Sequence, residues 1–149
     1  MLKKSFVCNE LQDLRLHSIS NSTVESLWLE TLNGNNKYII GGIYRHPAQN
    51  INTFSSIIDK SFEYLSKNGT PCIIPGDFNI DLSKYCVNRD TTEYVNCLLI
   101  NNFMPMIILP TRIVGTSSTL TDHIYYCEGH NKKIGALNLQ VIDFGSKGG

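Results

Sequence analysis

This chain of 149 residues lacks several features that assign many proteins to a class. Its 13 basic and 13 acidic side chains cancel, so it has no excess of the positive charge that strengthens nonspecific binding to nucleic acid. No apolar run approaches the length of a membrane span, and no apolar stretch follows Lys3 and Lys4 as it would in a secretory signal. There is also no repeat, linker or low-complexity tract. We therefore expect an intracellular protein, nuclear or cytoplasmic, with a single domain over residues 1–149.

The cysteines do not indicate a disulfide framework or a zinc site. Their number is odd and none of them forms a CxxC pair: Cys8, Cys72, Cys86, Cys97 and Cys127. We expect free thiols in a reducing compartment. Hydrophobic residues make up 42% of the chain and charged residues 17%, which is typical of a globular domain with a real core.

Strands and helices alternate along the chain. Apolar runs over residues 25–32 and 37–44, joined by an Asn-Gly turn, predict a β-hairpin. Further strands are expected at residues 104–109, 124–127 and 134–142. The pattern predicts an α/β (α+β) fold, with sheet layers covered by helices and site residues at strand ends.

Two helices are predicted from the spacing of apolar residues. The first covers residues 53–67, with Asn52 placed to cap its start and Gly69 just past its end. The second covers residues 91–101, where Asp90 can cap and Glu93 can complete a capping box. Apolar residues that recur on one face of each helix are expected to be buried, which in the second helix are Tyr94, Val95, Leu98 and Leu99.

The most informative segment is residues 72–81, CIIPGDFNID. A short apolar strand stops at Pro-Gly, and Asp77, Asn79 and Asp81 then alternate with apolar residues. In an extended backbone these three side chains point the same way. Two carboxylates and an amide are costly to bury together unless a metal, a phosphate or a reacting water meets them. The segment is therefore a candidate site.

Two other interpretations of this segment deserve weight. Asp and Asn are ordinary turn residues, because their side chains bond to nearby backbone groups. The spacing Asp-x-Asn-x-Asp also opens a calcium-binding EF-hand loop. That loop needs Gly at its sixth position and Glu at its twelfth, where this chain has Leu82 and Asn88. An EF-hand is excluded, whereas the turn interpretation stays open.

Three motifs occur in the order 41–47 (GGIYRHP), 76–79 (GDFN) and 117–124 (SSTLTDHI). Their order resembles that of the endonuclease/exonuclease/phosphatase (DNase-I-like) family. There they are similar to a strand ending in a phosphate-facing Tyr, to the family signature and to a Ser/Thr-x-x-Asp-His-Ile motif. Residues 25–30 resemble the preceding strand in endonuclease domains of non-LTR (LINE-like, jockey-type) retrotransposons. The resemblance implies a DNase-I-like layered sandwich of β-sheets flanked by helices, here incomplete.

What the resemblance implies about chemistry is metal-dependent hydrolysis of DNA phosphodiesters, with Mg²⁺ or Mn²⁺ as cofactor. Asp77 would orient or deprotonate the attacking water, Asn79 would help to hold the phosphate, and Tyr44 would contact a phosphate oxygen. Asp122 would orient a catalytic His from a final Ser-Asp-His motif. Asp77 and Asn79 would be the metal ligands. DNA is the implied partner, and a reverse transcriptase domain could accompany the endonuclease in a parent element.

The chain also departs from the family pattern. The early segment with the metal-binding Glu has no recognisable counterpart, and Lys147 and Gly148 stand where the final Asp and His are expected. The chain therefore resembles a fragment truncated at both ends, for which weak or absent activity is expected. A noncatalytic remnant that binds nucleic acid or protein, and a small-molecule phosphatase of the same fold, remain alternatives.

The remaining candidates have structural interpretations. His123 lies next to Asp122 and should point to the opposite face of its strand, so we expect a structural role. Trp28 is expected in the core. His17 and His130 are expected at the surface, and His46, which lies near the predicted site, is left open.

Overall fold

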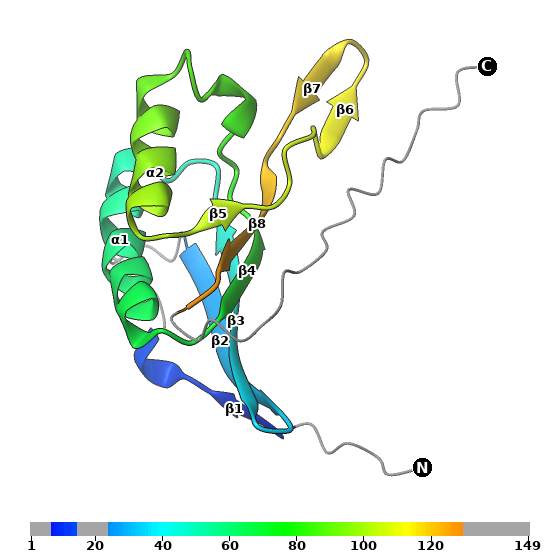
Figure 1. Ribbon diagram of the computed structural model, residues 1–149. Coiled ribbons are helices and arrows are strands. Elements are labelled where there is room, and N and C mark those ends of the chain that lie inside the picture. The colour runs from blue at the N-terminus through cyan, green and yellow to red at the C-terminus, as the bar shows by residue number, and fades with distance from the viewer. Residues whose placement is uncertain (1–6, 15–23, 130–149) are drawn as a thin grey trace, which may run out of the picture.

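The computed structural model describes residues 7–14 and 24–129 of the chain. In this part, six strands form one mixed sheet in the order β1-β2-β3-β4-β8-β5, and both long helices cover one face of it (Figure 1). The strands of this sheet are β1 Val7–Glu10, β2 Val24–Asn33, β3 Asn36–Arg45, β4 Cys72–Asp77, β5 Met104–Pro105 and β8 Asp122–Cys127. The helices are α1 Ile51–Asn68 and α2 Arg89–Ile100, with short 3₁₀ turns η1 Gln12–Leu14 and η2 Leu82–Lys84. The mixed α/β class is as predicted.

The hairpin of β2 and β3 forms around the Asn-Gly turn, as the sequence predicted. Asn33 pairs with Asn36, and Gly34 adopts a φ of 64°, which a two-residue hairpin turn requires and glycine tolerates. β3 then pairs with β4 in parallel through α1, and β4 pairs with β8 in antiparallel. The three strands that carry the predicted site residues are therefore neighbours.

The helix starts differ from the prediction by two residues. Asn50, not Asn52, caps α1, because its Oδ1 accepts a hydrogen bond from the backbone N–H of Thr53 at 3.0 Å. Asn52 instead donates to Asp90 at the start of α2, at 3.2 Å. At the other end Gly69 closes α1 with a φ of 72°, as expected of a left-handed C-cap.

The second helix also starts earlier than predicted. Asn88 caps α2, since its Oδ1 accepts from the N–H of Thr91 at 2.9 Å, whereas Asp90 lies inside the first turn. No capping box forms at the predicted place, because Glu93 pairs with Arg89 at 2.7 Å. Leu99, predicted to be buried, is 40% exposed, because the buried stripe of α2 follows Thr91, Tyr94, Val95 and Leu98.

The later strands differ from the prediction in length or were missed. β8 begins at Asp122, two residues before the predicted strand at residues 124–127. Only Met104 and Pro105 of residues 104–109 pair with β8, and the last bond of this edge joins the N–H of Met106 to Ile124 O at 2.8 Å. The chain then leaves the sheet and forms a separate hairpin, β6 Arg112–Val114 with β7 Ser117–Thr119 (Figure 1). The predicted strand at residues 134–142 lies outside the described residues.

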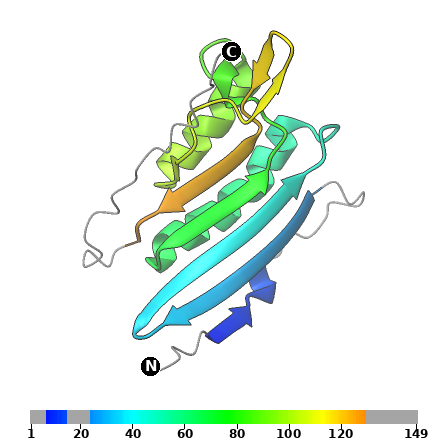
Figure 2. The ribbon, with the colours of Figure 1, turned by 90° about the vertical axis from the view of Figure 1, so that its right-hand side faces the viewer.

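Aromatic side chains from both helices and the sheet form the centre of the core. The ring of Phe78 lies within 6.4 Å of the rings of Phe54, Tyr94 and Tyr125, centroid to centroid. Trp28 is fully buried, as predicted, and lies over Gly41 on the same face of the sheet. Figure 2 shows the sheet with α1 and α2 behind it and its other face uncovered by described elements.

Candidate functional site

Three of the four predicted site residues lie in one row across the sheet. Tyr44 on β3 pairs with Asp77 on β4, and Asp77 pairs with Asp122 on β8. Residues directly opposite each other on neighbouring strands project from the same face, with Cβ atoms about 5 Å apart. The row lies on the face opposite the helices, and Tyr44 is 40% exposed there. The hydroxyl and the two carboxylates therefore share one accessible surface.

A fourth residue of the row was not recognised from the sequence. Glu25 on β2 pairs with Tyr44, so its carboxylate joins the same face at the edge of the site. The sequence was sufficient to predict this pairing, because a two-residue turn at Asn33–Asn36 fixes the register of the whole hairpin. A shallow hollow of about 450 Å³ adjoins the row, lined by Glu25, Ser26, Leu27, Gly42, Ile43, Tyr44, Pro75 and Gly76.

The predicted alternation beyond Asp77 is wrong, because the extended backbone ends there. Asn79 has a φ of 50°, in the left-handed region, which Asn adopts more readily than most other non-glycine residues. The backbone N–H of Asn79 donates to Asp77 Oδ1 at 3.1 Å, which is an Asx turn. The side-chain amide of Asn79 turns towards β3 and donates from Nδ2 to Arg45 O at 2.8 Å. Asn79 thus lies close to the row without being part of it.

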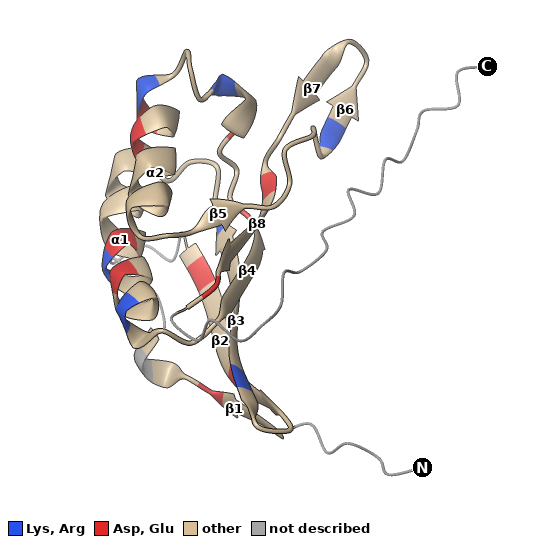
Figure 3. Ribbon diagram, viewed as in Figure 1, with Lys and Arg blue, Asp and Glu red and all other residues tan. Residues whose placement is uncertain are grey.

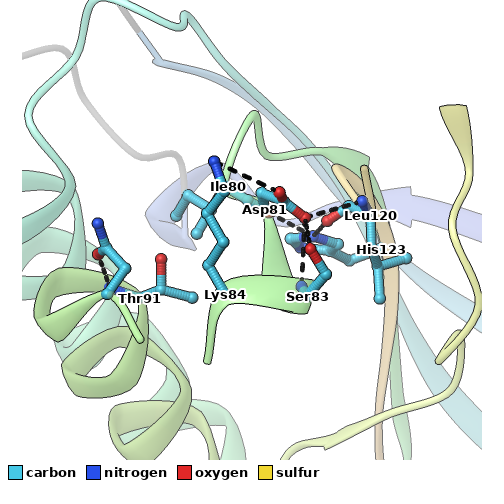
Figure 4. Close-up of polar contacts among 8 residues, drawn as sticks. Ile80, Asp81, Ser83, Lys84, Thr91, Leu120 and His123 are labelled. Carbon is cyan, nitrogen blue, oxygen red and sulfur yellow. Dashed lines mark hydrogen bonds and ion pairs between the residues drawn. The ribbon is translucent and has the colours of Figure 1, made fainter. Parts of the chain in front are cut away.

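Asp81 is directed away from the row and has a structural role. Its Oδ1 accepts hydrogen bonds from Ser83 N at 3.2 Å, Ser83 Oγ at 2.6 Å and Leu120 N at 3.0 Å (Figure 4). Burial by itself would raise the pKa of Asp81, but these hydrogen bonds, together with Lys84 at 3.7 Å, lower it. Asp81 caps η2 and ties it to the chain entering β8.

His123 occupies the face of β8 opposite Asp122, as predicted. Its ring is 2% exposed and stacks on Phe78, with centroids 5.0 Å apart. Nε2 lies 3.0 Å from both Ile80 O and Leu120 O, and the Tyr125 hydroxyl lies 2.8 Å from Nδ1. Two carbonyl neighbours require the proton on Nε2, so Nδ1 accepts from Tyr125. Burial lowers the pKa of His123, which favours the neutral ring.

The surface around the row is acidic. Glu25, Asp77 and Asp122 all belong to it, whereas the described Lys and Arg residues are spread over α1, α2, η2, β3 and β6 (Figure 3). Arg45, the basic residue next to Tyr44 on β3, is only 2% exposed. A phosphate approaching this surface therefore meets negative charge unless a cation neutralises it.

The donor set suits Mg²⁺ in kind but provides few ligands. Carboxylate and amide carbonyl oxygens suit this ion, and it often binds through one or two carboxylates plus waters and a substrate phosphate. Within residues 7–14 and 24–129, no group of three or more His, Cys, Asp or Glu side chains is gathered to hold a metal ion. The described residues therefore fit a Mg²⁺ ion that would be held partly by the protein and partly by a phosphate substrate.

The remaining expectations from the sequence concern the cysteines, two histidines and membrane spans. All five cysteines are free thiols. His17 and His130 lie outside the described residues, as do Lys147 and Gly148. In the described part of the chain, no helix combines the length and the apolar character needed to cross a membrane.

Comparisons with known proteins identify the fold. No protein-family model and no curated protein matches the sequence. Among solved structures, the chain is similar to the endonuclease domain of TRAS1, a telomere-specific non-LTR retrotransposon, with a TM-score of 0.61 and 13% identity over 83% of this chain and 56% of that one. It is also similar to D. rerio TDP2 complexed with a single-strand DNA product, with a TM-score of 0.50 and 13% identity, covering 84% of this chain and 54% of that one.

A third similar structure is an endonuclease/exonuclease/phosphatase protein from Bacteroides vulgatus, with a TM-score of 0.51 and 10% identity over 81% of this chain and 53% of that one. These matches confirm the fold that the order of the motifs predicted: the chain has part of the endonuclease/exonuclease/phosphatase, DNase-I-like fold. It spans slightly more than half the length of each of these proteins.

Proposed function

We propose that this chain, which has part of the endonuclease/exonuclease/phosphatase fold, hydrolyses phosphodiester bonds of DNA with the help of Mg²⁺ or Mn²⁺. The observation that supports this most is the row of Tyr44, Asp77 and Asp122 on three neighbouring strands, with Asn79 beside it. A phosphodiester is shielded by its negative oxygens, so hydrolysis needs positive charge, an oriented water and donors for the phosphate. A bound cation would supply the positive charge, and separate side chains of this site can meet the other two needs.

Asp77 and Asn79 would hold the cation, with Asp122 near enough to share in its binding. A bound Mg²⁺ neutralises phosphate charge and makes an attached water more acidic. Three carboxylates in the row make such a cation necessary, because DNA would otherwise be repelled. Since few protein groups hold the ion, we expect weak metal binding in the absence of DNA and slow turnover.

Side chains of the site would orient the attacking water and bind the phosphate. The Asp77 carboxylate uses Oδ1 to accept from Asn79 N, so Oδ2 is the oxygen placed to orient the attacking water and accept its proton. Asn79 Nδ2 carries two hydrogens, and one is bonded to Arg45 O, so the other can donate to a phosphate oxygen. The Tyr44 hydroxyl, which is partly exposed in the same row, donates to a second phosphate oxygen.

Asp122 would orient the group that protonates the leaving oxygen. The family resemblance implies a His for this task, but His123 faces away from the row and is fully engaged by backbone carbonyls and Tyr125. Within the described residues the leaving oxygen would therefore take its proton from water. This is a second reason to expect slow hydrolysis.

Nicking of supercoiled plasmid in Mg²⁺ tests the proposal. Wild-type protein should nick slowly and stop when EDTA is added, and Asp77→Asn should reduce the rate about 100-fold or more because it removes the proton acceptor. Asp90→Asn is the matched control, since Asp90 lies in the first turn of α2 and outside the row, and it should nick like wild type. Purifying all three proteins in parallel also excludes a contaminating nuclease.

The outcome distinguishes the alternatives. Equal nicking by wild type and Asp77→Asn would refute the assigned site. Salt-sensitive DNA binding without Mg²⁺-dependent nicking would indicate a noncatalytic binding protein. Release of phosphate from small phosphomonoesters without nicking would indicate a phosphatase, although no cluster of Lys and Arg for a phosphorylated headgroup adjoins the row in the described residues.

A further inference from the structure

The loop that follows Asp77 is held by side chains from the two strands that flank β4. Arg45 on β3 donates from Nε to Phe78 O at 2.6 Å and from Nη2 to Asn79 O at 2.7 Å. His123 on β8 donates from Nε2 to Ile80 O at 3.0 Å. Three successive backbone carbonyls thus accept hydrogen bonds from buried side chains, although neither Arg45 nor His123 belongs to the row itself.

This loop needs such support because it departs from sheet geometry inside the protein. The left-handed backbone of Asn79 takes the carbonyls of residues 78–80 out of the strand ladder. Buried carbonyl groups without partners are costly, and a strained residue persists only where its surroundings hold it. Phe78 fixes the start of the loop, because its side chain is fully buried in the aromatic core. The two donors then fix the direction of the peptide groups that follow.

Arg45 is joined to Asn79 twice. Its guanidinium holds Asn79 O, and its own backbone oxygen accepts from Asn79 Nδ2 at 2.8 Å. The same guanidinium also donates from Nη1 to Gln49 O and His46 O, in the turn that leads into α1. It lies 5.8 Å from the centre of the Phe54 ring. A planar fork with five N–H donors can reach all of these carbonyls, which a single ammonium group cannot.

His123 secures the far end of the loop. Its Nε2 also lies 3.0 Å from Leu120 O, while Asp81 accepts from Leu120 N (Figure 4). The Tyr125 hydroxyl fixes the ring from behind through Nδ1, and Tyr94 donates to Tyr125 at 3.2 Å. The end of the loop and the entry to β8 are therefore held as one unit against α2.

We propose that Arg45 and His123 are positioning residues, which set the direction of the Asp77 carboxylate and the Asn79 amide by fixing the backbone of residues 78–80. The proposal deepens the proposed function and rests on it for its catalytic consequence. If the peptide at Asn79 turns, its N–H leaves Asp77 Oδ1 and its side-chain amide leaves Arg45 O at the same time. Both groups that would meet water and phosphate then lose their direction.

Amide hydrogen exchange followed residue by residue by NMR tests this positioning directly. Arg45→Lys keeps the positive charge but removes the planar guanidinium group with its five N–H donors. The Asn79 amide, which reports its bond to Asp77, should then exchange at least about tenfold faster. Amides in the middle of α1 and α2 should change less than about twofold. Arg89→Lys, the same substitution at an exposed Arg paired with Glu93, should leave Asn79 unchanged.

His123 provides a second variant pair in case Arg45→Lys does not fold. Gln can place its amide nitrogen near the position of Nε2, whereas Leu fills the space without a donor. His123→Leu should therefore speed exchange at Asn79 more than His123→Gln does. Faster exchange at Asn79 in step with α1 and α2 would mean a general loss of stability, and no change at Asn79 would mean no control of the loop. Either result overturns the proposal.

The nicking assay separates this proposal from the proposed function. If wild type nicks DNA, Arg45→Lys should lower the rate about 10- to 100-fold at saturating Mg²⁺, as expected for a residue that orients catalytic groups. An unchanged rate, with faster exchange at Asn79, would overturn the catalytic part. If wild type does not nick DNA at all, the proposed function fails, and hydrogen exchange still decides whether Arg45 and His123 position the loop.

Discussion

The neighbouring glycines of β3 allow a sharp test of the sheet and its two faces. A Cβ atom added at Gly41 would lie 2.2 Å from ring atom Cζ3 of Trp28 and 2.4 Å from Cε3. A Cβ atom added at Gly42 meets nothing within 4 Å. The two positions share a strand and differ in the face to which they project. The change Gly→Ala is therefore the same chemical perturbation, made once in the core and once on the open face.

The expected effects have opposite signs. Trp28 is fully buried, so it cannot move away from a new methyl group without disturbing the core, and such overpacking costs about 1–3 kcal/mol of unfolding free energy. Gly42→Ala meets no obstacle and restricts the unfolded chain, which stabilises a protein by about 0.4–1 kcal/mol. Because the restriction of the unfolded chain applies to both variants, they should differ by about the overpacking cost, roughly 1–3 kcal/mol in unfolding free energy.

Urea denaturation, followed by circular dichroism, measures this difference. With an m-value of about 2 kcal/mol per molar urea, the midpoints should lie about 0.5–1.5 M apart, with Gly41→Ala the lower. Trp28→Phe should rescue Gly41→Ala, because the smaller ring vacates the space that the methyl group needs. The indole N–H of Trp28 has no hydrogen-bond partner among the described residues, so its loss removes no polar contact.

Two results would contradict this reasoning. Midpoints within about 0.3 M of each other would mean that Trp28 does not lie over Gly41. A lower midpoint for Gly42→Ala than for Gly41→Ala would mean that the face of the candidate site is covered and the face beneath it is not.

Three further predictions concern the caps, pH and thiols. Asn50→Ala should lower the unfolding free energy by about 1 kcal/mol and Asn52→Ala by less, as measured by urea denaturation, because only Asn50 caps α1. Asp81 has a lowered pKa in the folded protein, so its stabilisation is complete above its unfolded pKa and is lost as pH falls through the folded value. The stability gap between wild type and Asp81→Asn should therefore be constant near neutral pH and shrink below pH 3.8, and a gap that widens there would contradict the cause assigned. In native protein, iodoacetamide should modify the exposed Cys86 and spare the buried Cys72, whose pKa is raised by burial, and mass mapping that finds equal labelling would refute this burial.

Local patterns in the sequence were sufficient for much of the fold. The Asn-Gly turn fixed the β2–β3 hairpin and with it the pairing of Glu25 with Tyr44, because a two-residue turn leaves one register. The apolar spacing of α1 and Gly69 after it predicted that helix. The helix starts were displaced because each start offers two possible caps that lie two residues apart, Asn50 and Asn52 in α1 and Asn88 and Asp90 in α2. Asn50 and Asn88 are the residues with the extended backbone of an N-cap.

The sequence alone determined the three motifs, their order and the alternation of side chains between the two faces of each strand. From this alternation it predicted that Asp122 and His123 would face opposite ways. Tertiary structure decided which strands are neighbours. Because β3, β4 and β8 lie side by side, Tyr44, Asp77 and Asp122 form a row. Tertiary structure also turned Asn79 out of the strand and made Arg45 a buried donor to its loop. The physical reason is that strand pairing and the burial of a polar group depend on contacts between residues far apart in the chain. The spacing of residues within one segment does not identify these contacts.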